Sequence, residues 1–154
     1  MILAFFISIV KYKWNYTINN TKEDKATRVK NYISSLRDMA SECNSYNIVA
    51  HYDYINRYSP DVNEEVLYSD CPKEFDSLFE VLISKEKSLE INTASIAKRI
   101  SNNAVNTMPD PRIIERYISM GGKFITLGSD AHKPEAIAQN FDIATEYLKS
   151  FGVK

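Results

Sequence analysis

The feature that most constrains this fold is a regular alternation of two kinds of segment along the chain. Short apolar runs, typical of buried strands, alternate with longer stretches in which apolar residues recur at helical spacing. Such alternation predicts a parallel β-sheet covered by helices, as a doubly wound sheet or as part of a barrel. We therefore expect an α/β fold, and the 154 residues are enough for one domain with a buried core.

The pattern places each expected element within a few residues. Strands are expected to end at His51, to cover 89–92 and to end at Leu127. Helices are expected over 22–45, from Pro72 onward, from Pro111 to Gly121, and over 134–149. Thr21 begins a sequence that resembles a capping box, the prolines suit first helical turns, and Gly121 suits a helix end. On the last helix, Ile137 and Phe141 are expected on the buried face.

Residues 1–20 form an atypical apolar leader, and we expect the folded domain to cover 21–154. The apolar run at 2–10 is far shorter than the roughly 20 residues that span a bilayer. Lys11 and Lys13 follow this run, whereas the positive charges of a signal peptide precede it. A buried strand is therefore favoured over membrane attachment, which is the alternative.

Net charge and cysteine content narrow the choice of partners. The formal net charge is -1 and the pI is about 6.1, so there is no basic footprint for nucleic acid or for an anionic membrane surface. We expect a small-molecule partner instead. Cys43 and Cys71 lack the spacing of a disulfide or metal motif, which favours two ordinary thiols in a reducing cytoplasm.

Polar groups with metal-binding chemistry follow three of the expected strands. His51 ends the first, Glu90 and Asn92 lie in the second, and Asp130 and His132 follow the third. Side chains two positions apart on an extended chain share a face, and functional groups of parallel α/β folds gather at the carboxyl ends of the strands. Mixed imidazole and carboxylate ligands suit zinc, iron or manganese better than calcium. Taken singly, each residue also has a structural explanation, as a hydrogen-bonded histidine, a solvated carboxylate or an amide that binds backbone.

Three motifs, in matching order and spacing, resemble the C-terminal half of the histidinol-phosphatases of the PHP (polymerase and histidinol phosphatase) superfamily. They are Ile48-Val-Ala-His-Tyr-Asp-Tyr-Ile-Asn-Arg-Tyr58, Leu89-Glu-Ile-Asn-Thr93 and Gly121-Gly-Lys-Phe-Ile-Thr-Leu-Gly-Ser-Asp-Ala-His-Lys-Pro134. The resemblance covers residues 25–154. It implies part of a distorted (β/α)7 barrel with a metal cluster at the carboxyl ends of its strands. The implied reaction is hydrolysis of L-histidinol phosphate to L-histidinol and phosphate, in histidine biosynthesis.

The resemblance also implies roles for single residues. It makes His51, Asp130 and His132 ligands of a divalent transition metal (zinc, manganese or iron), and Asp130 and His132 catalytic. It makes Arg57 a contact for the substrate phosphate, and a guanidinium can hold two phosphate oxygens at once. A second basic contact is expected at Lys98 or Arg99, for which a solvated helix surface is the alternative.

The chain departs from the family pattern in what it lacks. The family takes further ligands from an N-terminal His-x-His motif, and this chain has two histidines in all. We therefore expect a truncated phosphatase that is not competent alone, whose exposed sheet edges favour self-association or a complementing N-terminal half. The alternatives are a non-catalytic remnant or binding module with a PHP-like core, and a PHP phosphoesterase with another phosphorylated substrate.

Overall fold

The structure is a computed structural model that describes residues 24–59, 61 and 63–153, so the leader and Thr21 lie outside the described residues. Its strands are β1 (Ile48–Val49), β2 (Ser88–Asn92) and β3 (Ile125–Gly128). They form a parallel sheet in the order β1-β2-β3, with Leu89 opposite Val49 on one side and Ile125 on the other. This confirms the predicted α/β fold with a parallel sheet.

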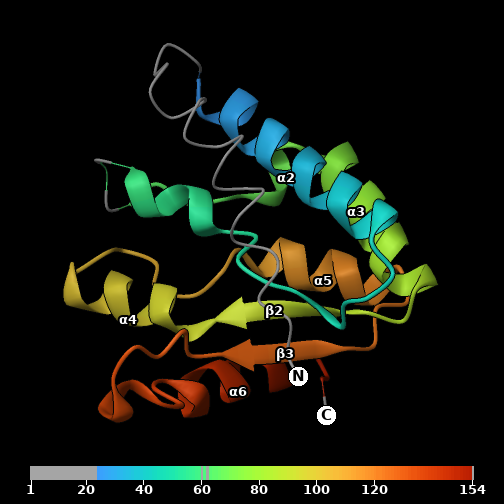
Figure 1. Ribbon diagram of the computed structural model, residues 1–154. Coiled ribbons are helices and arrows are strands. Elements are labelled where there is room, and N and C mark those ends of the chain that lie inside the picture. The colour runs from blue at the N-terminus through green and yellow to red at the C-terminus, as the bar shows by residue number, and fades with distance from the viewer. Residues whose placement is uncertain (1–23, 60, 62, 154) are drawn as a thin grey trace.

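Helices surround this sheet. They are α2 (Lys25–Glu42), α3 (Pro72–Ser84), α4 (Thr93–Ser101), α5 (Pro111–Ser119) and α6 (Phe141–Lys149), with short 3-10 helices η1 (Tyr54–Tyr58), η2 (Tyr68–Asp70) and η3 (Pro134–Ala136). Helices α2 and α3 pack side by side, and Figure 1 shows α6 below β3, on the other side of the drawn strands from α2 and α3. The arrows of β2 and β3 both point toward α4, so the carboxyl ends of the strands lie at the α4 end of the molecule (Figure 1).

Local signals in the sequence explain several helix ends. Asp24 accepts a hydrogen bond from the Thr27 N–H and caps α2, so this helix begins at Lys25, three residues later than expected. Asp110 caps α5 in the same way, and proline occupies the first turn of both α3 and α5. Gly121 follows α5 with a φ of 100°, a left-handed conformation that glycine adopts without strain.

The core lies between β2 and the helices. Leu89 and Ile91 are fully buried on one face of β2 and belong to the same core cluster as the buried apolar side chains of α3 and α5. The opposite face of β2 carries Ser88, Glu90 and Asn92, which are also buried, with 7–8% exposed. The central strand β2 therefore has one apolar face and one buried polar face. The polar side chains continue to the carboxyl end of the strand.

Two parts of the fold differ from the prediction. The last helix does not start at Pro134, because Ala138 and Asn140 adopt positive φ angles of 57° and separate η3 from α6. Ile137 falls in this break and is 69% exposed, so its predicted place on a buried helix face was wrong. Helix α4 was not predicted as an element of its own, and it follows β2 without an intervening loop.

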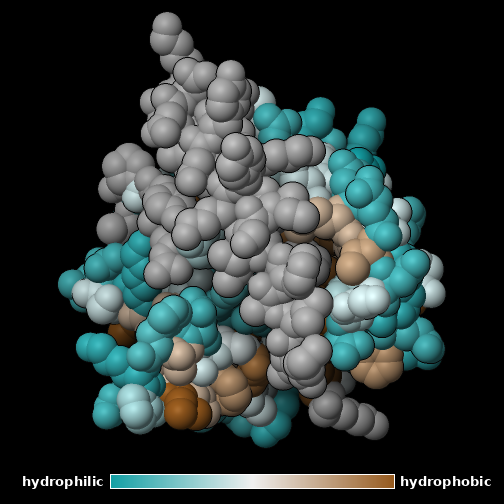
Figure 2. All heavy atoms as spheres, in the orientation of Figure 1, coloured by the Kyte–Doolittle hydropathy of each residue, from teal (hydrophilic) through white to brown (hydrophobic). Residues whose placement is uncertain are grey.

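Among the residues that are coloured in Figure 2, hydrophilic side chains predominate and the hydrophobic ones form small separate patches. Among the described residues, no helix combines the length and apolar character needed to cross a bilayer.

Candidate functional site

A cavity of about 210 Å³ lies at the carboxyl ends of the strands. Its wall combines residues that follow β1, β2 and β3 with residues of η1 and α4. Of the predicted site residues, it includes His51, Asn92, Asp130, His132, Lys98 and Arg99. The structure thus brings together polar groups that are far apart in the sequence.

His51 and Asp130 follow β1 and β3 in left-handed backbone conformations, with φ angles of 62° and 44°. Such conformations are uncommon in residues other than glycine, although asparagine, aspartate and histidine adopt them more often than the rest, and they cluster at functional sites. The carbonyl of His51 accepts hydrogen bonds from the Tyr32 hydroxyl and from the Tyr54 N–H. These two contacts hold the turn through which His51 reaches the cavity.

Asn92 joins the end of β2 to both α4 and His51. Its Oδ1 accepts hydrogen bonds from the N–H groups of Ala94 (2.8 Å) and Ser95 (3.2 Å), which makes it the N-cap of α4. Its Nδ2 lies 2.8 Å from His51 Nδ1. The other histidine is held locally, since His132 Nδ1 lies 2.8 Å from the carbonyl oxygen of Asp130.

Buried carboxyl groups lie beside these histidines. The pKa of Glu90 is raised to about 7, chiefly by burial and then by the charges of Asp53 and Asp130. Gly128 allows Glu90 this position, because a Cβ at Gly128 would overlap the Glu90 carboxyl. Burial also raises the pKa of Asp53, while a hydrogen bond with Ser95 opposes that shift.

Asp53 lines the cavity, and it was not among the predicted site residues. The available signal was its spacing from His51, which is the same two-residue step that separates Asp130 from His132. The prediction considered residues in the expected strands and directly after them, and Asp53 lies beyond the end of β1, in the turn before η1.

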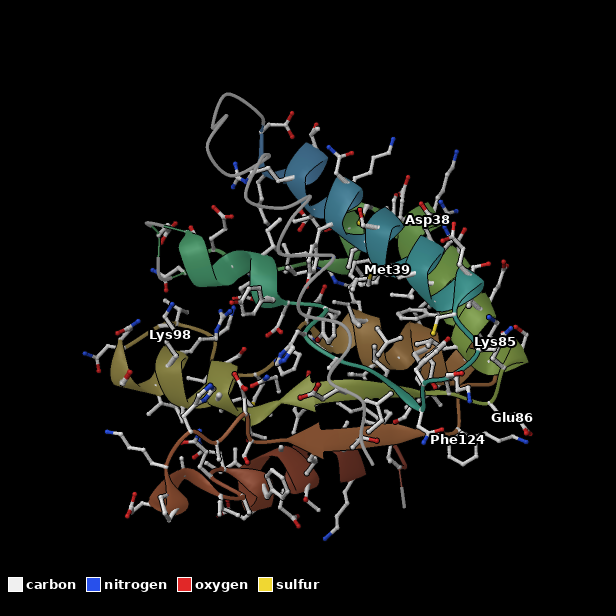
Figure 3. All side chains as sticks on the ribbon, viewed as in Figure 1. Asp38, Met39, Lys85, Glu86, Lys98 and Phe124 are labelled. Atoms are coloured by element: carbon white, nitrogen blue, oxygen red, sulfur yellow. The ribbon has the colours of Figure 1, made fainter. Side chains whose placement is uncertain are left out.

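The predicted phosphate contacts have different surroundings. Lys98 extends from α4 toward η1 beside the cavity (Figure 3). Arg99 is held in place by Glu65, whose Oε1 lies 3.0 Å from Nη2, and by the carbonyl of Asn106, which accepts from Nε at 2.6 Å. Arg57 belongs to η1, but its side chain lies outside the described part of the structure.

These residues do not make a complete metal centre. Among the described residues, no group of three or more histidine, cysteine, aspartate or glutamate side chains is arranged to hold a metal ion. Nδ1 is engaged in both predicted histidine ligands, by Asn92 in His51 and by the Asp130 carbonyl in His132.

The fold and the cavity together define the class: an α/β protein with a histidine and carboxylate site at the carboxyl ends of parallel strands. No family model matches the chain. It is 33% identical over 113 residues to a protein named probable histidinol-phosphatase from Clostridium acetobutylicum, a match that covers 73% of this chain and 42% of the relative. A probable histidinol-phosphatase from Thermotoga maritima is 32% identical over 109 residues, which cover 69% of this chain and 41% of the relative.

A solved structure gives the same result. The crystal structure of histidinol phosphate phosphatase from Lactococcus lactis, complexed with zinc, L-histidinol and phosphate, matches with a TM-score of 0.66 and 25% identity, over 87% of this chain and 49% of that chain. These matches confirm the resemblance to the histidinol-phosphatases over part of their length. The chain spans 42% and 41% of the two curated relatives, and this partial coverage agrees with a match to their C-terminal half.

Proposed function

We propose that this chain carries part of a phosphomonoesterase site that hydrolyses L-histidinol phosphate to L-histidinol and phosphate. The observation that supports this most is the convergence of His51, Asn92, Asp130 and His132 on one cavity at the strand ends. The Lactococcus lactis relative binds L-histidinol and phosphate, the two products of that reaction.

The charges around the cavity bear on how it would take a phosphate. Its described wall includes four acidic residues, Asp53, Asp61, Glu64 and Asp130, and two basic ones, Lys98 and Arg99, so acidic groups outnumber basic ones. Arg28 pairs with Glu64 at 2.9 Å. Phosphate would be repelled by such a wall unless positive charge were added. We propose that a divalent transition ion (zinc, manganese or iron) supplies it, with Asp130 and His132 as this chain's ligands and further ligands from beyond the described residues.

Two basic side chains are proposed to contact the substrate phosphate. Lys98 and Arg99 both line the cavity from α4, and the Arg99 guanidinium also holds Glu65 and the carbonyl of Asn106, which gives Arg99 a structural role. Arg57 keeps the phosphate-binding role that its motif implies. In an active form, Arg57→Ala or Lys98→Ala should weaken substrate binding with little effect on the chemical step, whereas Arg99→Ala should chiefly lower stability.

The other ligands are proposed to come from a partner, either an N-terminal half or a second copy of the chain. Among the described residues, β1 and β3 each pair with β2 and have no strand on their outer sides. Unpaired strand edges are ready surfaces for association. A partner that continued the sheet from these edges would stand beside the cavity.

The test compares the chain alone with the chain produced together with the N-terminal half of the Lactococcus lactis relative. L-histidinol phosphate hydrolysis is measured with added zinc or manganese for the wild-type chain, Asp130→Ala and His132→Ala. We expect turnover in the mixture only, and we expect both substitutions to abolish it. Robust turnover by the chain alone that needs both residues would show that it is competent without a partner.

The same experiment addresses the second candidate function, a non-catalytic binding module. Among the described residues, no three side chains are arranged to hold a metal ion, and this favours the binding module. A stable complex with the N-terminal half that binds phosphate but hydrolyses nothing would support the binding module and contradict the phosphatase. Turnover that is indifferent to Asp130 and His132 would identify a contaminating enzyme.

A further inference from the structure

We propose that the two histidines of the site are held in opposite tautomers, His51 with its proton on Nε2 and His132 with its proton on Nδ1. Asn92 is then a positioning residue that acts through His51. The tautomers concern the chain's own hydrogen bonds and do not depend on the proposed phosphatase activity, whereas the roles that we assign to the two rings rest on that proposed function.

The tautomer of His132 follows from its partner. Its Nδ1 lies 2.8 Å from the backbone carbonyl oxygen of Asp130, and a carbonyl oxygen can only accept a hydrogen bond. Nδ1 must therefore carry the proton, which leaves the lone pair of a neutral ring on Nε2. Histidines that ligate metals commonly donate their other ring N–H to a carbonyl or carboxylate in this way.

The tautomer of His51 follows from the cap of α4. Two backbone N–H groups, those of Ala94 and Ser95, point at one end of the Asn92 amide, and only the oxygen can accept from them. The NH₂ group of Asn92 must then be the end that faces His51 Nδ1 at 2.8 Å. Because this NH₂ group can only donate, Nδ1 must accept, and the proton of the neutral ring lies on Nε2.

This arrangement gives the two rings different capacities. Through Nε2, His51 offers a hydrogen-bond donor and His132 offers a lone pair. If His51 were to bind an ion through Nε2, its proton would move to Nδ1 and face the Asn92 NH₂ group, donor against donor. Relieving that conflict requires the amide to turn, and α4 would then lose its cap. We therefore assign His132 to the ion, and His51 to a hydrogen bond with an anionic oxygen of a substrate.

The first test reads the tautomers directly. The chain has two histidines, so a long-range ¹H–¹⁵N spectrum of the labelled protein at alkaline pH, where imidazoles are neutral, shows two rings. We expect a protonated Nε2 in one ring, assigned to His51, and a protonated Nδ1 in the other. His132→Gln provides the assignment. A protonated Nδ1 in His51, or equal populations of its two tautomers, would overturn the proposal.

The second test uses a matched pair of substitutions at Asn92. In Asn92→Asp the carboxylate can still cap α4 but accepts from His51, so we expect the His51 tautomer to reverse. Asn92→Ser keeps a capping oxygen without the donor, so we expect His51 to populate both tautomers. A His51 tautomer unchanged in both variants would overturn the role of Asn92. If neither variant folds, the wild-type spectrum still decides the tautomers.

The third test adds zinc alone to the metal-free protein. In the wild type we expect the His132 resonances to shift and those of His51 to stay. In Asn92→Asp we expect both rings to respond and zinc affinity to rise by about tenfold or more, because an oriented second partner commonly changes metal affinity by about 10–100-fold. Equal zinc responses of both rings in the wild type would overturn the assignment of the ion to His132.

Discussion

Glu90 is a single carboxyl group on the buried polar face of β2, 7% exposed, and its pKa is raised to about 7 from an ordinary 4.5, first by burial and then by Asp53 and Asp130. At a pH between these two pKa values, Glu90 keeps its proton in the folded chain and has lost it in the unfolded chain. The free energy of unfolding must therefore fall as the pH rises through this window. We expect Glu90→Gln to remove this fall, which is on the order of 3 kcal/mol, when urea unfolding is measured at about pH 4.5 and about pH 8.

A matched control for Glu90 is Glu80→Gln, which removes a carboxylate from the exposed face of α3. This control should keep the pH dependence of the wild type. If Glu90→Gln and Glu80→Gln follow the same curve from acid to alkaline pH, Glu90 is not the group responsible.

Gly128 sits at the end of β3 where the Glu90 carboxyl packs against its backbone. A Cβ at this position would overlap that carboxyl, so Gly128→Ala must displace Glu90 or the strand end. We expect a loss of about 1–3 kcal/mol in the free energy of unfolding, which is typical of overpacking. Glu90→Ala should relieve most of this loss in the double mutant, and additive losses would show that the overlap is not the cause.

Single residues of the site were predictable to different degrees. His51, Asp130 and His132 follow apolar runs, and strand ends in parallel α/β folds meet at one edge, so their convergence could be expected from the sequence. Asp53 lies in a turn, where no strand period applies. The hydrogen bond from Asn92 to His51 depends on which way a helix cap orients one amide, and this is a property of the three-dimensional structure.

At the scale of elements, Lys85 links the end of α3 to the end of α2. Its Nζ donates to the carbonyl oxygens of Ala40 (2.9 Å), Ser41 (2.6 Å) and Cys43 (3.0 Å) and lies 3.0 Å from Asn44 Oδ1. The last carbonyls of a helix have no partners within the helix, and a cation stabilises this end of the helix dipole.

We expect Lys85→Met to lower the free energy of unfolding by about 1–3 kcal/mol, because it removes charge-assisted hydrogen bonds to these carbonyls. Lys73→Met, on the exposed surface of the same helix, is the matched control and should have little effect. Chemical denaturation of both variants measures the difference. Equal stabilities would mean that water replaces Lys85 at the end of α2 without loss.

Strong signals made α3 and α5 predictable, since each combines a first-turn proline with a continuous apolar stripe. Helix α4 has a weaker signal, because Ile96 is its only apolar side chain that is fully buried and its cap, Asn92, is also the last residue of β2. The break before α6 comes from positive φ angles at Ala138 and Asn140. An alanine in the sequence does not indicate a positive φ angle, so this break could not be predicted.

At the scale of the whole molecule, the parallel sheet was predictable because helix and strand patterns alternate along the chain. That these residues belong to a larger metal site could be predicted only from the motif resemblance. The sequence has two histidines, which are fewer than the histidine ligands that the resemblance implies. The matched segments make up 42% and 41% of the two relatives, so more than half of each relative lies outside the match. The remaining ligands are therefore proposed to come from beyond the residues that the structure describes.

That proposal gives an expected metal content. Because no three-ligand group is found among the described residues, and Asn92 engages His51, we expect the isolated chain to bind at most one transition ion, and weakly. Elemental analysis after purification and competition with a chromophoric chelator measure stoichiometry and affinity. Asp130→Ala and His132→Ala should each lower zinc occupancy, while Asp38→Ala, on α2 away from the cavity in Figure 3, should not. Two or three tightly held ions per chain would contradict the expectation and would require ligands contributed across an interface between copies of the chain.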